Sequence, residues 1–375
     1  MKIVRLGEPK VIMSNPDSKH DYFAWPTAIR LKNGKIAVVA SGFRLRHVCP
    51  FGKTVISYSE NEGETYTLPA PVIDTVLDDR DGGISTFGES GVIVTSFNNT
   101  VSLQMRYAEI SKGGTASFCR QGNGFSAYDQ AYLDAITPEE QSAALGSTFR
   151  MSFDHGISFG SIYKAPVTSP HGPTELLDGS LVWVGNPLVS SEEPDFDMHR
   201  IEAHAIRTDG SSELLGAIDL QQDLRETSEC CEVHAVTLDD GSLLAHIRVE
   251  RKGDHPLFTL FQSVSRDGGR SWSEPRQILS DLGGAPSHLL KTSSGMLICS
   301  YSYRCEPYSV RVMFSKDNGD TWEDGQDLYV NGVNKDLGYP STVELSDGSF
   351  ITVFYAHRAP GESAVILQQK WKTEE

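Results

Sequence analysis

The sequence has no long hydrophobic run and too few basic residues to balance its acidic ones. Its first residues, MKIVRLGEPKVIMS, carry charges throughout, and no later stretch approaches the length of a membrane span. The formal net charge of −17 argues against a broad nucleic-acid surface, because such a surface needs Lys and Arg to neutralise phosphates. As given, the chain is therefore expected to be soluble and cytoplasmic, and to bind neither membranes nor nucleic acids.

Cysteine is sparse as well, and no cofactor motif is present. Disulfide-stapled domains and structural zinc sites need densely or closely paired cysteines, and the chain has no Cys-x-x-Cys pair. Gly52-Lys53-Thr54 lacks the upstream glycine of a phosphate loop, and the histidines have no metal-ligand spacing. We expect no cofactor and no metal site, and free thiols at all six cysteines, which are Cys49, Cys119, Cys230, Cys231, Cys299 and Cys305.

What the sequence does contain is a repeat of hairpins along its whole length. Each repeat alternates apolar and polar residues, turns at a glycine, and alternates again, which is typical of two paired antiparallel strands. A chain of 375 residues with such a repeat can form one all-β unit. The six predicted hairpins lie at residues 28–41, 83–97, 173–185, 234–248, 288–301 and 341–355.

A second motif follows most of the hairpins and reads Ser-x-Asp/Asn-x-Gly-x-Ser/Thr-aromatic. Asp or Asn accepts hydrogen bonds within a tight turn, Gly supplies the left-handed residue, and the aromatic side chain packs on the neighbouring hairpin. The motif therefore indicates a fold rather than a catalytic site. It occurs as SENEGETY (59–66), SFDHGISF (152–159), SRDGGRSW (265–272) and SKDNGDTW (315–322).

These four segments resemble the Asp-box, or BNR, repeats of the sialidase superfamily. The resemblance implies an all-β, six-bladed β-propeller that covers residues 1–375 as a single domain. A degenerate box, RTDGSS (207–212), marks blade three. The opening segment KIVRLG is expected to close the ring beside the last blade, because closure protects the sheet edges.

One insertion interrupts the repeat within blade two, at residues 100–147. Thr137, Pro138 and Glu140 have the spacing of a helix N-terminal capping box, and Gly146 is a suitable stop. We predict two short helices here. Because the insertion follows the second strand of its blade, it should form a wall or lid over one face of the propeller.

That face also receives the beginning of every first strand and the end of every second strand, since strands alternate in direction. Arg, His, Tyr and Glu concentrate at these positions in an otherwise acidic chain, which predicts a polar pocket for an anionic ligand. Arginine suits carboxylates because its planar fork donates two parallel hydrogen bonds. The predicted substrate-binding residues are Trp25, Arg44, Arg46, Arg80, His171, Arg248, His288 and Arg304.

The sialidase resemblance implies roles for four of the residues on this face. In that family a Tyr that opens the last blade is the nucleophile, a Glu that opens the fourth blade is its base, and arginines hold the substrate carboxylate. Tyr339, Glu232, Arg248 and Arg304 are similar to these residues. A phenol needs a neighbouring carboxylate to accept its proton before it can attack at neutral pH. A neutral nucleophile also avoids repulsion by an acidic sugar.

The chain departs from the family at two places. Where the family has Arg-Ile-Pro before the first hairpin, it reads Ala24-Trp25-Pro26, so one carboxylate-binding arginine is missing. The segment RLRHVCPFG (44–52), where the general-acid Asp would fall, has no carboxylate. His47 and Asp81 are the alternative candidates for the acid, and Arg44 or Arg46 is a candidate replacement for the arginine.

Three hypotheses follow for the function. The first is a sialidase-type glycoside hydrolase that acts on an acidic sugar with Tyr339 as nucleophile and Glu232 as base. The second is a lyase or atypical glycosidase that acts on a uronate through a His or Tyr base and arginines. The third is a glycan-binding propeller without catalysis, for which the missing acid carboxylate is an argument. In all three the partner is an acidic sugar or glycan.

Overall fold

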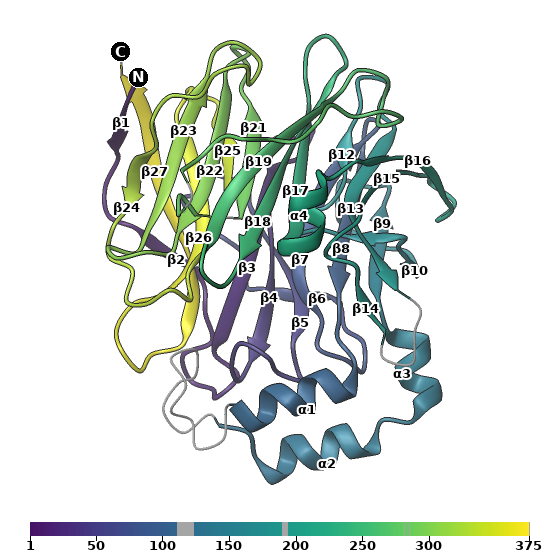
Figure 1. Ribbon diagram of the computed structural model, residues 1–375. Coiled ribbons are helices and arrows are strands. Elements are labelled where there is room, and N and C mark those ends of the chain that lie inside the picture. Colours follow the sequence, from purple (N-terminus) through teal and green to yellow (C-terminus); the bar gives the residue numbers. More distant parts are fainter. Residues whose placement is uncertain (111–123, 190–193, 281, 285, 375) are drawn as a thin grey trace.

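The computed structural model describes residues 1–110, 124–189, 194–280, 282–284 and 286–374. Its strands form six antiparallel sheets that are arranged as the blades of a propeller, as the sequence predicted (Figure 1). In each blade the first strand lies innermost, and every predicted hairpin is present as the pairing between the first and second strands of a blade.

Blades one and two follow the repeat in chain order. Apolar side chains of the two blades, among them Ile56 and Ile84, pack between the sheets in one buried cluster. Blade one contains β3 (Tyr22–Arg30), β4 (Ile36–Arg44), β5 (Lys53–Ser59) and β6 (Ala70–Ile73), and blade two contains β7 (Arg80–Phe87), β8 (Gly91–Phe97), β9 (Ser147–Ser152) and β10 (Ile162–Lys164).

Blade three is less regular than its neighbours. Its innermost strand is split into two short pieces that both pair with β13, and His171 lies between them. The blade contains β11 (Val167–Thr168), β12 (Thr174–Glu175), β13 (Leu181–Val189), β14 (Asp195–Phe196), β15 (Ile201–Ile206) and β16 (Ser212–Ile218).

Blades four and five return to the regular pattern. A short helix, α4 (Gln222–Thr227), leads into blade four and contacts its first strand. Blade four contains β17 (Glu229–Thr237), β18 (Leu243–Arg251), β19 (Leu257–Ser265) and β20 (Arg276–Gln277), and blade five contains β21 (Ser287–Lys291), β22 (Leu297–Tyr303), β23 (Ser309–Ser315) and β24 (Gln326–Tyr329).

Blade six closes the ring with both ends of the chain. The two N-terminal strands pair antiparallel with the C-terminal strand, and Lys2 lies opposite Glu374, so the predicted closure is confirmed. Figure 1 shows the two termini side by side. The blade contains β25 (Gly338–Glu344), β26 (Phe350–His357), β27 (Ala364–Glu374), β1 (Lys2–Arg5) and β2 (Lys10–Met13).

The Asp-box turns repeat one hydrogen-bond pattern. In the box of blade four, Ser265 Oγ accepts a hydrogen bond from Gly269 N at 2.8 Å, and Asp267 Oδ1 accepts one from Ser271 N at 2.8 Å. The equivalent bonds recur in the boxes of blades one, two and five. These carboxyl and amide groups are occupied by their own turns, which confirms that the motif serves the fold.

The insertion lies between β8 and β9, at one end of the propeller (Figure 1). The two predicted helices are present as α2 (Ala127–Ala135) and α3 (Pro138–Ala144), and the capping box at Thr137 is confirmed. A third helix, α1 (Val101–Ile110), was not predicted. Five of the cysteines are free thiols and Cys119 lies outside the described residues.

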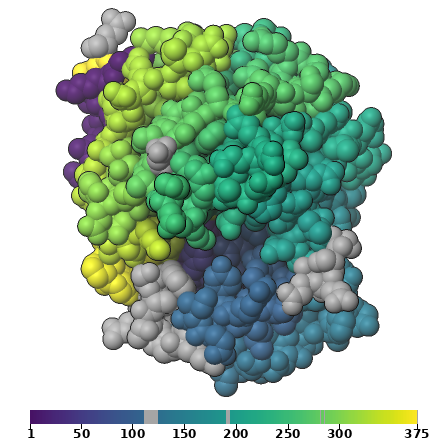
Figure 2. Space-filling view, in the orientation of Figure 1, coloured from purple at the N-terminus to yellow at the C-terminus, as the bar shows by residue number. Residues whose placement is uncertain are grey.

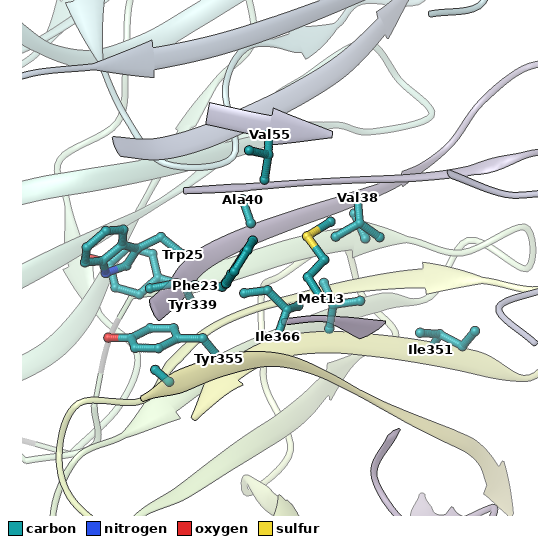
Figure 3. Close-up of a cluster of buried hydrophobic side chains, with 14 of the residues drawn as sticks. Met13, Phe23, Trp25, Val38, Ala40, Val55, Tyr339, Ile351, Tyr355 and Ile366 are labelled. Carbon is teal, nitrogen blue, oxygen red and sulfur yellow. The ribbon is translucent and has the colours of Figure 1, made fainter. Parts of the chain in front are cut away.

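The core between blades one and six ends in aromatic residues. Aliphatic side chains such as Val38 and Ile366 fill most of this buried cluster. Figure 3 shows Trp25, Tyr339 and Tyr355 gathered at one end of it. The apolar core therefore leads directly into the face that carries the predicted site.

Candidate active site

In five of the six blades, one residue near the beginning of the first strand has a positive φ. A positive φ is rare for residues other than glycine and costs about 1–3 kcal/mol, so it marks positions that the surrounding structure holds for a purpose. Four of the five lie where the strand register shifts in a β-bulge. The residues are Trp25 (φ 54°), Asp81 (φ 51°), His171 (φ 69°), Glu232 (φ 52°) and Tyr339 (φ 46°).

In blade five, the described part of the first strand has no residue with a positive φ. Leu289 N donates to His234 Nδ1, and Thr342 N donates to His288 Nδ1, so His234 and His288 occupy equivalent positions in adjacent blades. The equivalent of Glu232 in blade five is therefore Pro286, whose ring fixes φ at a negative value.

The predicted nucleophile and base are in direct contact. Tyr339 Oη donates a hydrogen bond to Glu232 Oε1 at 2.5 Å, and Arg248 NH1 donates to the same oxygen at 2.7 Å. Tyr339 is only 5% exposed. Burial and the nearby carboxylates of Glu232 and Asp81 hold the pKa of Tyr339 well above its usual value. The phenol therefore needs Glu232 as proton acceptor to become a nucleophile.

The two predicted carboxylate-binding arginines differ in what they already hold. Arg248 is bound at both ends of its fork, because its NH2 also donates to Glu250 Oε2 at 2.5 Å. Arg304 donates its Nε–H to the carbonyl of Leu337 and lies 5.6 Å from the centre of the Tyr339 ring. Among the described residues no carboxylate forms an ion pair with Arg304, so its guanidinium is available beside the nucleophile.

Asp81 is the carboxyl group on this face that suits a general acid. Burial raises its pKa to about 7, with a further contribution from the charge of Glu232 that opposes the effect of Arg80. Its Oδ1 is buried without a hydrogen-bond partner. A carboxyl group that keeps its proton near neutral pH can donate it to a leaving group.

Arg44 and Arg46 are committed to the protein itself. Arg44 is fully buried and forms an ion pair with Asp78 at 2.6 Å. Arg46 forms an ion pair with Asp129 of α2 at 2.9 Å. The nitrogens of Arg44 are used within the fold, which argues against the expectation that Arg44 replaces the missing family arginine, whereas NH1 of Arg46 is buried without a hydrogen-bond partner. The two ion pairs support the loop after β4 and the helical insertion.

His47 belongs to a buried network around Asp336. Its Nδ1 lies 3.1 Å from Asp336 Oδ1 and 3.2 Å from Tyr22 Oη, and Tyr22 donates its own proton to Asp336 Oδ2. Nδ1 of His47 therefore carries the proton. Burial lowers the pKa of His47, so the ring is neutral at pH 7. Asp81, rather than His47, holds an exchangeable acid proton near that pH.

Asp336 accepts hydrogen bonds from four side chains. The remaining two are Tyr355 Oη at 3.0 Å and His357 Nε2 at 2.9 Å. Because His357 Nδ1 also faces a carbonyl, of Glu362 at 2.7 Å, both of its nitrogens must donate and the ring is an imidazolium. Burial alone would lower the pKa of His357, but the hydrogen bond and charge of Asp336 outweigh burial and raise it.

His171 and His288 lie in the central channel rather than beside Tyr339. Together with His234 they form a cluster with ring centres 4.5–5.1 Å apart. Burial lowers the pKa of all three, that of His234 to about 3. The backbone N–H groups on Nδ1 of His234 and His288 leave Nε2 protonated, which opposes metal binding. The described residues contain no cluster that could hold a metal ion.

The insertion borders the site. Besides the Arg46 ion pair, Tyr128 of α2 stacks on Phe51 with ring centres 5.1 Å apart, and Tyr132 donates to the carbonyl of Val76. Figure 2 shows a recess between the insertion and the blades above it, with residues from early in the chain at its back. These contacts place the insertion as a wall of the candidate site.

In the described part of the chain no helix is long and apolar enough to cross a membrane.

A cavity opens at the ends of the first strands that lie away from Tyr339 and Glu232. It has a volume of about 880 Å³ and is lined by the far ends of the first strands, with His234 and His288 among its residues. Arg30 at this end is paired with Glu62, and Lys291 is paired with Asp239. The cavity does not include Tyr339 or Glu232, so the volume of a cavity does not by itself identify the candidate active site.

The family is decided by a sequence match. The profile of the BNR repeat-like domain matches residues 142–352, which is more than half of the chain. The chain belongs to the BNR repeat-like domain family. A comparison with curated proteins gives no match.

Solved structures similar to this BNR repeat-like protein share its fold at low identity. A protein of unknown function from Dyadobacter fermentans has a TM-score of 0.73 at 18% identity, with 99% of both chains covered. The intramolecular trans-sialidase from Ruminococcus gnavus has a TM-score of 0.65 at 13% identity, with 97% of both covered. An α-L-arabinofuranosidase from Fusarium graminearum has a TM-score of 0.57 at 11% identity, with 98% of both covered.

Sequence reasoning missed several polar residues in and around the site of this BNR repeat-like chain. Asp336 and Tyr355 were not proposed, although Asp336 lies only three residues before Tyr339. Glu250, which occupies half of the Arg248 fork, was also missed. Glu250 follows Arg248 by two residues on the same strand, and that spacing puts both on one face of the sheet and was a usable signal.

Proposed function

We propose that the protein is a glycoside hydrolase in which Tyr339 attacks the anomeric carbon of a sugar that carries a carboxylate. The observation that carries this proposal is the 2.5 Å hydrogen bond from Oη of the buried Tyr339 to Glu232 Oε1. Both residues also have a positive φ, and strained backbone of this kind is concentrated at functional sites.

The proposed reaction has two steps. In the first, the Tyr339 oxygen bonds to the anomeric carbon while its proton passes to Glu232, and the glycosidic bond breaks as Asp81 protonates the leaving oxygen. In the second, Asp81 takes a proton from water, the water oxygen bonds to the anomeric carbon as the bond from that carbon to the Tyr339 oxygen breaks, and Glu232 returns the proton to Tyr339. Two displacements at one carbon give net retention of configuration.

Charge supports an acidic sugar as substrate. A neutral phenol approaches a carboxylated sugar without the repulsion that a carboxylate nucleophile meets, and Arg304 lies beside that phenol without an acidic partner among the described residues. Arg248 has a different proposed role, because Glu232 and Glu250 already occupy its fork. It holds Glu232 toward Tyr339.

The test combines turnover with covalent trapping. Aryl glycosides of sialic acid, glucuronic acid, galacturonic acid and L-arabinofuranose are assayed first, and release of an acidic sugar is expected. The accepted sugar is then supplied as a fluorinated derivative with an activated leaving group, which slows the second step. Peptide mass spectrometry should find the sugar on Tyr339, and the Tyr339→Phe protein should remain unlabelled. Label on another residue, or an unsaturated uronate as product, would contradict the proposal.

A further inference from the structure

The Trp25 ring lies between two guanidinium groups. The Arg44 carbon is 4.9 Å from the ring centre and the Arg80 carbon is 4.3 Å from it. Stacking on an indole attracts a cation and fixes the plane of its fork. Trp25 directly follows Ala24, which stands where the family has an arginine, at the start of the first blade. The chain thus has two arginines around the position that lost one.

The two arginines differ in how their N–H groups are used. Arg44 donates to Ser41 Oγ at 2.7 Å, to the carbonyl of Asp79 at 3.2 Å and to the carbonyl of His47 at 2.8 Å, besides its ion pair with Asp78. Every terminal nitrogen of Arg44 therefore has a partner, and the side chain is closed to any ligand.

Arg80 has no hydrogen bond from its guanidinium to any residue that the structure describes. Its nearest carboxylate atoms, on Asp78 and Asp81, are 3.7 Å and 3.8 Å away, beyond hydrogen-bond distance. The side chain is nevertheless only 10% exposed, and its Nε is buried without a partner. Burial alone would lower the pKa of Arg80, but the charges of Asp81 and Asp78 raise it, so the group stays charged.

A buried, charged fork without hydrogen bonds is costly unless a ligand completes it. Three further buried atoms without partners belong to neighbours of Arg80 on this face, namely Asp81 Oδ1, Glu232 Oε2 and Arg248 Nε. The Trp25 and Tyr339 rings have centres 6.5 Å apart, and Arg304 lies on the Tyr339 ring. Arg80 and Arg304 thus lie on neighbouring rings around the proposed nucleophile.

We infer that Arg80, held on the Trp25 ring, binds the substrate carboxylate together with Arg304, in place of the arginine missing from the start of blade one. This inference rests on the proposed function for the identity of the bound group. It makes Trp25 and Arg80 the pair that sets specificity for an acidic sugar. Arg248 contributes no charge to that subsite, since Glu232 and Glu250 neutralise it.

The test measures binding rather than turnover. Isothermal titration is done with free N-acetylneuraminic acid, with free D-glucuronic acid and with the methyl esters of both, on the wild-type protein and on Arg80→Met. Removing charge-assisted hydrogen bonds should weaken binding of the acid about 10- to 100-fold. Binding of the ester should change little, because the ester has no carboxylate. The ratio of the two losses separates recognition of the carboxylate from general damage to the pocket.

A matched control is available in blade five. Arg311 stacks on Tyr303 with its guanidinium carbon 3.7 Å from the ring centre, and it is paired with Asp327. Arg311→Met removes a stacked arginine of the same kind away from the pocket, and it should leave the binding of both acids unchanged. Arg80→Lys, which keeps the charge but lacks the fork, should lose less affinity than Arg80→Met and serves if the latter does not fold.

The outcomes separate this inference from the proposed function. Equal binding of the acid by wild type and both Arg80 variants overturns the inference, even if Tyr339 is labelled and glycosides are cleaved. Weakened binding of the acid without any turnover or labelling supports the Arg80 subsite and rejects the hydrolase. If the wild-type protein binds neither acid, the inference is overturned.

Discussion

Two buried polar clusters meet at Trp25, and they differ in how completely their groups are paired. The Asp336 cluster consists of Asp336, His357, His47, Tyr22 and Tyr355, and its carboxylate accepts four hydrogen bonds. The pocket cluster consists of Arg80, Asp81, Glu232, Arg248 and Tyr339, and four of its atoms are buried without a partner.

The pKa shifts follow the same division. Burial alone would raise the pKa of Asp336, but His47 and His357 outweigh burial and hold it well below its usual range. Burial dominates at Asp81 and raises its pKa to about 7. A fully paired network is a device for holding the fold, whereas unpaired groups with shifted pKa values are typical of sites that await a ligand. The comparison therefore assigns stability to one cluster and chemistry to the other.

The largest expected effect comes from removing the phenol of the pocket cluster. Tyr339→Phe deletes the proposed nucleophile, and we expect kcat to fall on the order of 10³-fold or more. Steady-state kinetics on the accepted aryl glycoside measure the loss. Binding of the free acidic sugar should persist, because Arg80 and Arg304 are unchanged. Full activity in this variant would remove the chemical distinction between the two clusters.

Asp81→Asn should reduce kcat about 10²- to 10⁴-fold for a substrate with a poor leaving group, as expected for the loss of a general acid. The wild-type rate should fall as pH rises above about 7, since Asp81 must keep its proton and its pKa is about 7. The pH–rate profile of the variant should lack this alkaline limb.

Asp79 offers the control for that experiment. Burial raises its pKa to about 7 as well, but its carboxylate accepts hydrogen bonds from Thr75 N at 2.6 Å and Thr75 Oγ1 at 3.0 Å. Asp79→Asn should therefore leave the alkaline limb in place. If the limb disappears in the Asp79 variant and persists in the Asp81 variant, the acid has been assigned to the wrong residue.

Asp336→Asn tests whether the Asp336 cluster stabilises the fold. It leaves the His357 imidazolium buried without its counter-ion, which should lower the free energy of unfolding by about 3–5 kcal/mol. The lowered pKa of Asp336 gives stability that is present above about pH 3.9 and is lost as pH falls. The raised pKa of His357 gives stability that is present below about pH 6.5 and is lost as pH rises.

Denaturant unfolding between pH 4 and 8 measures both effects. The wild-type protein should gain most from the pair between about pH 4 and 6.5, and the Asp336→Asn profile should be flatter there. An unchanged free energy of unfolding at pH 6 would show that the Asp336 cluster does not stabilise the fold.

The difference between the Asp336 cluster and the pocket cluster also bears on which features were predictable from the sequence. Alternation and turn glycines fixed the hairpins, and the repeat then placed Glu232 and Tyr339 at equivalent positions, where they do meet. The partners of Arg44 and Arg46 were not predictable, because Asp78 comes from the segment before β7 and Asp129 comes from helix α2. The position of the His171 ring depends on its contact with Thr27, which comes from blade one rather than from the blade of His171.

The Asp336 cluster escaped prediction for a related reason. Its members come from blade one, from blade six and from the segment before β25, and no local pattern joins them. Helix α1 was missed although Thr100 is a usable N-cap signal, since Thr100 Oγ1 accepts a hydrogen bond from Leu103 N at 3.1 Å. A second contact at its start, from Val101 N to Gln141 Oε1, comes from the far end of the insertion. Periodic local patterns in the sequence therefore predicted the blades of the propeller. The pairs formed by polar residues far apart in the sequence could be identified only from the structure.

The smallest effect is expected when the same kind of substitution, Tyr to Phe, is made in the Asp336 cluster. Tyr22→Phe removes one of four hydrogen bonds to Asp336, from an oxygen that still accepts one from His357. The free energy of unfolding should fall by about 1.5–3 kcal/mol, the range for a hydrogen bond to a charged group. The kcat of the variant should stay within about twofold of wild type, because Tyr22 touches no group of the proposed reaction. Since Tyr22 also contacts His47, a large fall in kcat with a normal unfolding transition would show that the Asp336 cluster takes part in the chemistry through His47.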